Sequence, residues 1–202
     1  DMDVLLQFDF SNETAHHQSE GALELVVRQW RRDCGGGGRD LWAYDNDLNL
    51  LWHHKVDPPY GHHNAVHIFD LNADGRPEVM AGGTLVSSEG VTLATHDLGH
   101  EMSKIRGAGH YDAVIVGDLS NDPEVDPVAF LMGGSAGVYV IDAMTGRTRA
   151  THRIGHSQWG LMCKLREDIP GMQVLSGTRW WNYGILTLFS VLGFLQADVS
   201  TI

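Results

Sequence analysis

The stretch that decides the fold is GHHNAVHIFDLNADGRPEVMAGG, residues 61–83, because two later stretches repeat its outline. Residues 109–134 read GHYDAVIVGDLSNDPEVDPVAFLMGG, and residues 155–178 read GHSQWGLMCKLREDIPGMQVLSGT. The Gly-His pairs that open the three copies are 48 and 46 residues apart. A period in this range is typical of propellers and solenoid arrays.

Each copy predicts a strand, a tight polar turn, a second strand and a glycine break. The first two copies continue into further hairpins, TLVSSEGVTLAT and AGVYVIDAMTGRTRAT, and RDLWAYDNDLNLLWHHK resembles the same outer hairpin. The pattern predicts an all-β chain, a β-propeller of four-stranded antiparallel blades with a repeat of about 47 residues. We expect one domain, 1–202, which forms part of a larger ring, with units at about 21–60, 61–108, 109–154 and 155–195, the last incomplete.

Composition narrows the function classes. The formal net charge is −12 and there is no basic stripe, which argues against a nucleic-acid partner. No apolar stretch is long enough to span a membrane, and no signal peptide is present, although one could have been removed.

Two cysteines, Cys34 and Cys163, are too few for a disulfide scaffold; they could pair, stay free or bind metal. Twelve histidines keep metal and acid-base chemistry open.

The sharpest local motif is DLNADGRPE, residues 70–78. Oxygen side chains at its first, third, fifth and ninth positions, with a carbonyl at the seventh, can surround a hard cation such as Ca²⁺. The alternative is a turn that caps itself without metal. The predicted ligands of a structural Ca²⁺ ion are Asp70, Asn72, Asp74, Glu78 and, through its carbonyl, Arg76.

Histidines recur where the first strand of each unit is expected to begin. In a propeller such positions converge, so they predict a polar pocket suited to proton transfer. The alternative is that each Gly-His pair is a structural device. The candidates for this pocket are Tyr60, His62, His63, Asn64, His110, Tyr111, Asp112, His156 and Gln158.

A second candidate segment is TRWWNYG, residues 178–184. Arg179 could hold a carboxylate in bidentate fashion, and Asn182 could add a neutral hydrogen bond. Trp180 and Trp181 could stack on sugar rings, or simply fill space between blades. Cys163 lies seven residues after His156, so Zn²⁺ ligation by this pair is also possible.

The combination of GHYDAVIVGDL, VYVIDAMTG, IGHSQWG and DIPGMQVLSGTRWWNYGI resembles the propeller-type polysaccharide lyases. These include the rhamnogalacturonan lyases of polysaccharide lyase family 11 and the ulvan lyases. The resemblance runs from about residue 40 to residue 190. DLNADGRPE is similar to the calcium turn of FG-GAP-type propeller blades.

The resemblance implies a seven- or eight-bladed propeller that is secreted and cleaves a uronic-acid-containing polysaccharide by β-elimination. In that reaction one group neutralises the sugar carboxylate and others remove and return protons. Arg179 and Asn182 would neutralise the carboxylate, with a metal as the other possibility. His62, His110, His156 and Tyr60 would supply base and acid, and His63, Trp180 and Trp181 would bind substrate.

Two positions depart from the pattern that the resemblance implies. Trp181 stands where a smaller residue is expected, and Lys164 replaces a metal ligand of the turn. The competing function is a non-catalytic calcium propeller of the FG-GAP type that binds carbohydrate or protein, or one that only scaffolds a larger assembly.

Overall fold

The computed structural model describes residues 3–8, 25–30, 40–45, 47–56, 66–96, 110–120, 127–180 and 184–190. Every regular element in these ranges is a β-strand. The strands are β1 (Asp3–Phe8), β2 (Leu25–Trp30), β3 (Asp40–Tyr44), β4 (Leu50–Lys55), β5 (Val66–Phe69), β6 (Glu78–Ala81), β7 (Thr84–Val86), β8 (Thr92–Thr95), β9 (Ala113–Gly117), β10 (Val128–Met132), β11 (Val138–Asp142), β12 (Thr148–His152), β13 (Ser157–Cys163), β14 (Gln173–Thr178) and β15 (Leu186–Ser190).

These strands form four antiparallel sheets, in the orders β1-β2-β3-β4, β5-β6-β7-β8, β9-β10-β11-β12 and β13-β14-β15. Each sheet is a meander, so every strand pairs with its neighbour in the chain. The prediction of an all-β chain with antiparallel sheets is therefore confirmed. The propeller ring and its number of blades stay predictions.

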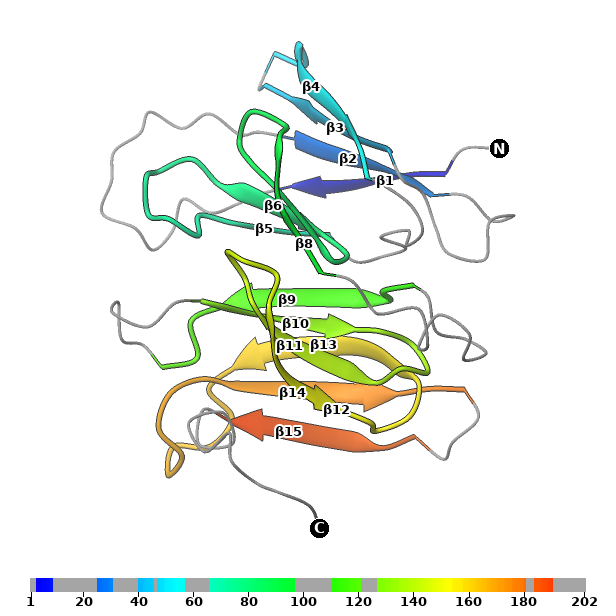
Figure 1. Ribbon diagram of the computed structural model, residues 1–202, viewed down its shortest axis with the longest axis vertical. Coiled ribbons are helices and arrows are strands. Elements are labelled where there is room, and N and C mark those ends of the chain that lie inside the picture. Colours follow the sequence, from blue (N-terminus) through cyan, green and yellow to red (C-terminus); the bar gives the residue numbers. More distant parts are fainter. Residues whose placement is uncertain are drawn as a thin grey trace.

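The sheets follow one another in chain order along the long axis of the molecule (Figure 1). Three apolar clusters join them face to face. The first, around Leu41 and Val79, joins β1–β4 to β5–β8. The second, around Met80 and Leu131, joins β5–β8 to β9–β12, and the third, around Phe130 with Val174 and Phe189, joins β9–β12 to β13–β15.

Alternation along the strands explains this stacking, because successive side chains of a strand point to opposite faces. In β10, Ala129 and Leu131 lie in the cluster with the preceding sheet, whereas Phe130 and Met132 lie in the cluster with the following one. All five residues of this strand are buried. A sheet covered on both faces gives such a continuous apolar run.

The first strands of the last three sheets, β5, β9 and β13, lie next to one another, and the candidate site lies beside them. β9 contacts β5 on one side and β13 on the other. The amide of Val116 in β9 donates a 2.8 Å hydrogen bond to Nδ1 of His67 in β5. Residues just before β9 and β13 are consequently neighbours.

The first sheet contains a strand that the repeat pattern does not indicate. The hairpin of residues 39–55 is present as β3 and β4, and β1 lies upstream of residue 21. β1 contains no copy of the Gly-His pattern, so the repeat signal could not indicate it. Within the described residues, the last sheet has three strands.

Candidate functional site

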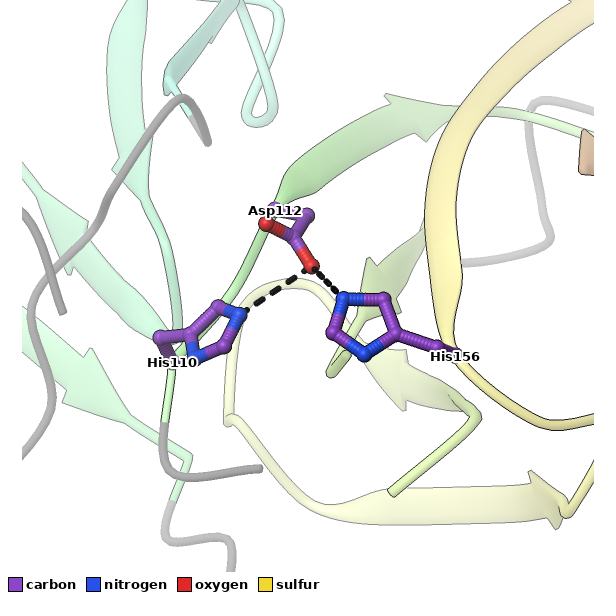
Figure 2. Close-up of side chains that lie close together, drawn as sticks. All are labelled: His110, Asp112 and His156. Carbon is purple, nitrogen blue, oxygen red and sulfur yellow. Dashed lines mark hydrogen bonds and ion pairs between the residues drawn. The ribbon is translucent and has the colours of Figure 1, made fainter. Parts of the chain in front are cut away.

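Two of the predicted histidines meet at a shared carboxylate. His110 and Asp112 lie just before β9, and His156 lies just before β13. Oδ2 of Asp112 is 3.2 Å from Nε2 of His110 and 3.1 Å from Nε2 of His156 (Figure 2). The two imidazole rings have centroids 5.8 Å apart. Residues 46 positions apart in the chain thus share one site.

Backbone hydrogen bonds hold the chain that carries Asp112 and the chain next to His156. The amide of Asp112 donates to the carbonyl of Met132 at 2.8 Å, which extends the β9–β10 pairing. The amide of Ser157 donates to the carbonyl of Gly134 at 3.0 Å, so the β10–β11 turn anchors the start of β13. The site is therefore held by strand ends of two sheets rather than by a long loop.

The site is largely shielded from water. Asp112 is 3% exposed and His156 is 7% exposed. Burial lowers the pKa of His156, and the neighbouring His110 acts in the same direction, while the Asp112 carboxylate partly opposes the shift. His156 is accordingly neutral at neutral pH.

The neutral ring of His156 has a defined pattern of hydrogen bonds. Its Nε2–H donates to Asp112, which leaves Nδ1 as the acceptor. The hydroxyl of Ser135, in the β10–β11 turn, lies 3.0 Å from Nδ1 and donates to it. Ser135, His156 and Asp112 thus form a hydrogen-bonded relay that ends at His110.

A buried hydrogen-bond network holds Tyr111, which lies between His110 and Asp112. The hydroxyl of Tyr111, which is 1% exposed, lies 2.9 Å from Nδ1 of His96. Nε2 of His96 lies 3.0 Å from Oγ1 of Thr148 in β12. His96 follows β8, so this network ties the preceding sheet to the chain that carries His110 and Asp112.

The cluster can serve proton transfer or hold a metal ion. Its three donor atoms, two imidazole nitrogens and one carboxylate oxygen, all lie within 4.8 Å of one another. Such a set suits Zn²⁺ and other divalent metals. Without a metal, the carboxylate orients the imidazoles and stabilises an imidazolium.

Arg179 and Trp180 follow β14, next to the cluster. The amide of Arg179 donates to the carbonyl of His156 at 2.8 Å. Both side chains are exposed, and the Arg179 guanidinium lies 4.6 Å from the centre of the Trp180 ring. Trp180 has a φ of 61°, an uncommon backbone conformation for a bulky residue. The pair presents a cationic and aromatic surface at the edge of the site.

The remaining predicted residues of this region lie outside the described residues. They are Tyr60, His62, His63, Asn64, Trp181 and Asn182. Gln158 is described: it is the second residue of β13 and is partly buried.

The predicted calcium turn lies between β5 and β6. Asp70 accepts hydrogen bonds from the amides of Asp74 and Gly75, at 3.2 and 2.9 Å. The carboxylate of Glu78 accepts from the amide of Leu71 at 2.9 Å. The carboxylates of Asp70 and Glu78 thus accept hydrogen bonds from amides of the turn.

Glu78 also gives this turn buried negative charge of the kind that a cation can neutralise. It is 3% exposed, and burial raises its pKa, with the charges of Asp74 and Asp70 adding to the rise. A bound cation would relieve the repulsion among these carboxylates, so the donor set fits Ca²⁺. The Arg76 side chain pairs with Glu89 at 2.7 Å and does not compete for the turn carboxylates.

Cys163 does not join His156. His156 directly precedes the strand β13 and Cys163 ends it, so about 23 Å of extended chain separate the two residues. The cluster of metal-compatible side chains within the described ranges contains no cysteine. The possible Cys163–His156 pair for Zn²⁺ is therefore not brought together in the structure, and Cys34 lies outside the described residues.

Sequence reasoning placed Asp112 beside the histidines but gave it no role, and it missed Ser135 and His96. Equivalent positions of successive repeats were the only signal that two distant histidines meet. The direction of a side chain in a turn, such as that of Ser135, leaves no comparable trace in the sequence.

Comparison with known proteins gives structural matches alone. No family model matches the chain, and no curated protein matches it. A Bacillus licheniformis rhamnogalacturonan lyase PL11 matches with a TM-score of 0.56 and 21% identity, over 83% of this chain and 27% of that one. The exotype rhamnogalacturonan lyase YesX matches with a TM-score of 0.59 and 24% identity, over 83% and 28%. The computationally designed Ika4 protein matches with a TM-score of 0.52 and 14% identity, over 82% and 85%.

The chain thus spans just over a quarter of the length of the rhamnogalacturonan lyases it matches. The described part of the chain contains no helix that could cross a membrane. At these identities the similarity concerns the fold: the chain shares an arrangement of antiparallel sheets with part of the rhamnogalacturonan lyases.

Proposed function

We propose that this protein is a secreted polysaccharide lyase that cleaves a uronic-acid-containing polysaccharide, of the rhamnogalacturonan or ulvan type, by β-elimination. The observation that carries the proposal is the cluster of His110, Asp112 and His156, built from two repeats. The fold shared with part of the rhamnogalacturonan lyases supports it. The sheets belong to a propeller, and the substrate is an acidic glycan.

In this proposal His110 removes the proton next to the sugar carboxylate. Its side chain is 12% exposed against 6% for His156, so it is the more accessible imidazole. Asp112 stabilises the imidazolium that forms, and His156, kept neutral by burial, aligns the carboxylate. Arg179 neutralises the substrate carboxylate and thereby stabilises the enolate-like transition state.

The residues outside the described ranges have the supporting roles. Asn182 assists Arg179, and Tyr60 or His62 protonates the departing glycosidic oxygen. His63 and Trp181, together with Trp180, bind the sugar chain.

Metal ions have two places in the proposal. A structural Ca²⁺ would be held by the 70–78 turn, where it offsets the buried negative charge. Alternatively, His110, Asp112 and His156 would hold a divalent ion whose positive charge neutralises the substrate carboxylate, and His62 or Tyr60 would then act as the base.

The test is the ultraviolet absorbance of the unsaturated sugar that β-elimination creates. The purified protein is incubated with rhamnogalacturonan, ulvan and other uronic-acid polymers, with Ca²⁺ or with a chelator. We expect absorbance to rise with one polymer and His110→Ala to lower turnover by about 10²–10⁴-fold. His53→Ala, an exposed histidine on β4, is the matched control and should retain full turnover. No rise with any polymer from folded protein overturns the proposal.

The second candidate is a non-catalytic calcium propeller that binds carbohydrate. The exposed Arg179–Trp180 pair favours it, because an aromatic ring beside a cation can bind an acidic sugar without chemistry. In that case the glycan is retained without cleavage in affinity electrophoresis. Trp180→Ala then abolishes the retention, whereas His110→Ala does not.

A further inference from the structure

The turn between β13 and β14 occupies the place in the third repeat that the predicted calcium turn occupies in the first. Lys164 and Asp70 are each the ninth residue after the glycine of the Gly-His pair, and each directly follows the first strand of its sheet. Gln173 and Glu78 each begin the second strand of their sheet. The two turns can therefore be compared directly at these positions.

A buried side chain closes both turns in the same way. An oxygen of the Glu78 side chain accepts a hydrogen bond from the amide of Leu71 at 2.9 Å. Oε1 of Gln173 accepts the equivalent hydrogen bond from the amide of Leu165 at 2.8 Å. Both residues are buried, Glu78 at 3% and Gln173 at 0% exposure. The turns thus share this contact but differ in charge, because the amide of Gln173 is neutral.

The formal charge of the two turns differs accordingly. Residues 70–78 contain three carboxylates and one arginine, which gives −3 + 1 = −2. Residues 164–173 contain one lysine, one arginine and two carboxylates, which gives 2 − 2 = 0. An excess of carboxylates favours a bound cation such as Ca²⁺. The third turn, in contrast, is balanced by its own side chains.

The ammonium group of Lys164 binds carbonyl oxygens of its own turn. It donates hydrogen bonds to the carbonyls of Ile169 and Gly171, the second at 3.0 Å. Nε2 of Gln173 donates to the same carbonyl of Gly171 at 2.8 Å. Backbone carbonyls are also ligands of Ca²⁺ in protein turns. An ammonium group has a positive charge and three donors, so it can gather several carbonyls as a metal ion does.

The segment that Lys164 holds also contacts the neighbouring sheet. The amide of Met172 donates a 2.8 Å hydrogen bond to the carbonyl of Leu119, which lies just after β9. Gly171 has a φ of 71°, and a Cβ there would lie 2.1 Å from the same carbonyl oxygen of Leu119. The conformation of residues 169–172 therefore decides how the turn meets the sheet β9–β12.

We propose that the ammonium group of Lys164 is a built-in cation that holds the third turn against the neighbouring sheet without a divalent metal ion. The lysine does for residues 164–173 what a bound cation would do for residues 70–78. The junction between β9–β12 and β13–β15 consequently keeps its order when divalent ions are removed. This role rests on contacts within the third turn, so it depends neither on lyase activity nor on Ca²⁺ at residues 70–78.

The test is the hydrogen-exchange rate of the amides of Leu165 and Met172, measured by NMR with Ca²⁺ and with a chelator. In the native protein the chelator should leave both rates unchanged. Lys164→Met keeps the length of the side chain but removes its charge, and it should speed both exchanges by about 2- to 10-fold. Lys55→Met is the matched control, because Lys55 is an exposed lysine on β4, and it should change neither rate.

A double variant tests whether the lysine stands in the place of a metal ion. Lys164→Asp combined with Gln173→Glu gives the third turn the acidic residues that Asp70 and Glu78 supply in the first. Exchange at Leu165 and Met172 should then be fast with a chelator, and added Ca²⁺ should slow it. Lys164→Met adds no carboxylate and should not respond to Ca²⁺. Circular dichroism verifies that each variant is folded.

Each of three results would overturn the proposal. If a chelator speeds exchange at Met172 in the native protein, the third turn itself holds a metal ion. If Lys164→Met exchanges at the native rate, the ammonium group does not hold the turn. If the folded double variant ignores Ca²⁺, the lysine does not occupy the place of a metal ion.

Discussion

At the residue scale, Asp112 connects the two histidines that the repeat pattern brings together. A carboxylate can accept hydrogen bonds from both Nε2 atoms through Oδ2, as it does here at 3.2 and 3.1 Å. An asparagine has the same shape but carries no charge, and it cannot stabilise an imidazolium. The substitution therefore separates charge from packing.

Asp112→Asn should lower lyase turnover by about 10²-fold or more while the fold is retained. The measurement is the initial rate of absorbance increase on the polymer that the native protein cleaves. Asp118→Asn is the control, because Asp118 only caps the turn at Ser120 and lies outside the cluster. Equal rates for Asp112→Asn and native protein would remove Asp112 from the mechanism.

The buried carboxylate of Glu78 allows a test of whether the 70–78 turn binds Ca²⁺. Added Ca²⁺ should raise the melting temperature, and a concentration one hundred times the Kd would stabilise the fold by about 2.7 kcal/mol. Glu78→Gln should abolish this rise because it removes the buried carboxylate. Glu89→Gln, an exposed carboxylate outside the turn, should leave the rise unchanged. Identical melting curves of the native protein with Ca²⁺ and with a chelator would show that the turn caps itself.

Residue types in this site were predictable, whereas their geometry was not. Gly-His spacing indicated that His110 and His156 are equivalent, and equivalent positions of stacked sheets lie close together. The spacing could not show that Asp112 points between them. Nor could it show that the side chain of Arg179 lies over Trp180 while its amide binds the carbonyl of His156.

At the element scale, tight turns decide where the strands of each sheet meet. Gly137 directly precedes β11 and has a φ of 92°, and a Cβ there would lie 2.2 Å from the carbonyl oxygen of His152. Gly75 has a φ of 84°, but a Cβ there would meet nothing within 4 Å. The two positions share a backbone conformation and differ in the space around it.

Gly75→Ala should cost about 1–2 kcal/mol of unfolding free energy, the strain of a left-handed alanine. Gly137→Ala should lower the free energy of unfolding by clearly more, because strands β11 and β12 must also move apart. Urea unfolding followed by circular dichroism measures both values. Equal losses would mean that the contact with His152 is relieved without effect on the sheet.

The strands themselves were largely predictable. Alternation around Val138 and Val140 predicted β11, and the Met144–Gly146 turn predicted its pairing with β12. β1 was not predictable, because its sequence, DVLLQF, lacks the repeat outline and a turn signal that ties it to β2. When a strand lies far in sequence from the strand with which it pairs, local sequence patterns do not indicate the pairing.

At the scale of the whole molecule, buried side chains join one sheet to the next. His152 of β12 packs on Phe189 of β15, with ring centroids 4.9 Å apart. Burial lowers the pKa of His152 from its ordinary value of 6.5. The unfolded chain therefore binds a proton more readily than the folded one below that pH.

The free energy of unfolding should consequently fall as the pH drops below 6.5, through the interval between the ordinary pKa and the lowered one. Above that interval His152 is neutral in both states and contributes no pH dependence. His152→Gln should reduce the slope, because it removes the group whose pKa burial lowers. Denaturant midpoints across the acid range measure the slope, and an unchanged slope in His152→Gln would contradict this account.

The order of the sheets followed from the sequence only in part. The repeat predicted that similar units adjoin, and the clusters around Met80 and Phe130 show how they do so. Whether the odd or the even residues of a first strand face the following sheet decides how each sheet is oriented. The sequence alone does not show which set it is, and the structure shows it by packing Ile115 in the cluster with β13–β15.

Each of the two middle sheets packs with one face on the preceding sheet and with the other on the following sheet. This arrangement bears on how the number of repeats can increase by gene duplication. A tandem duplication of residues 109–154 would add a sheet with buried apolar residues for both of its faces. The copy would bring its own Gly-His pair and aspartate to the junction. Growth by duplication would thus extend the stack and reproduce half of a His-Asp-His site in a single event.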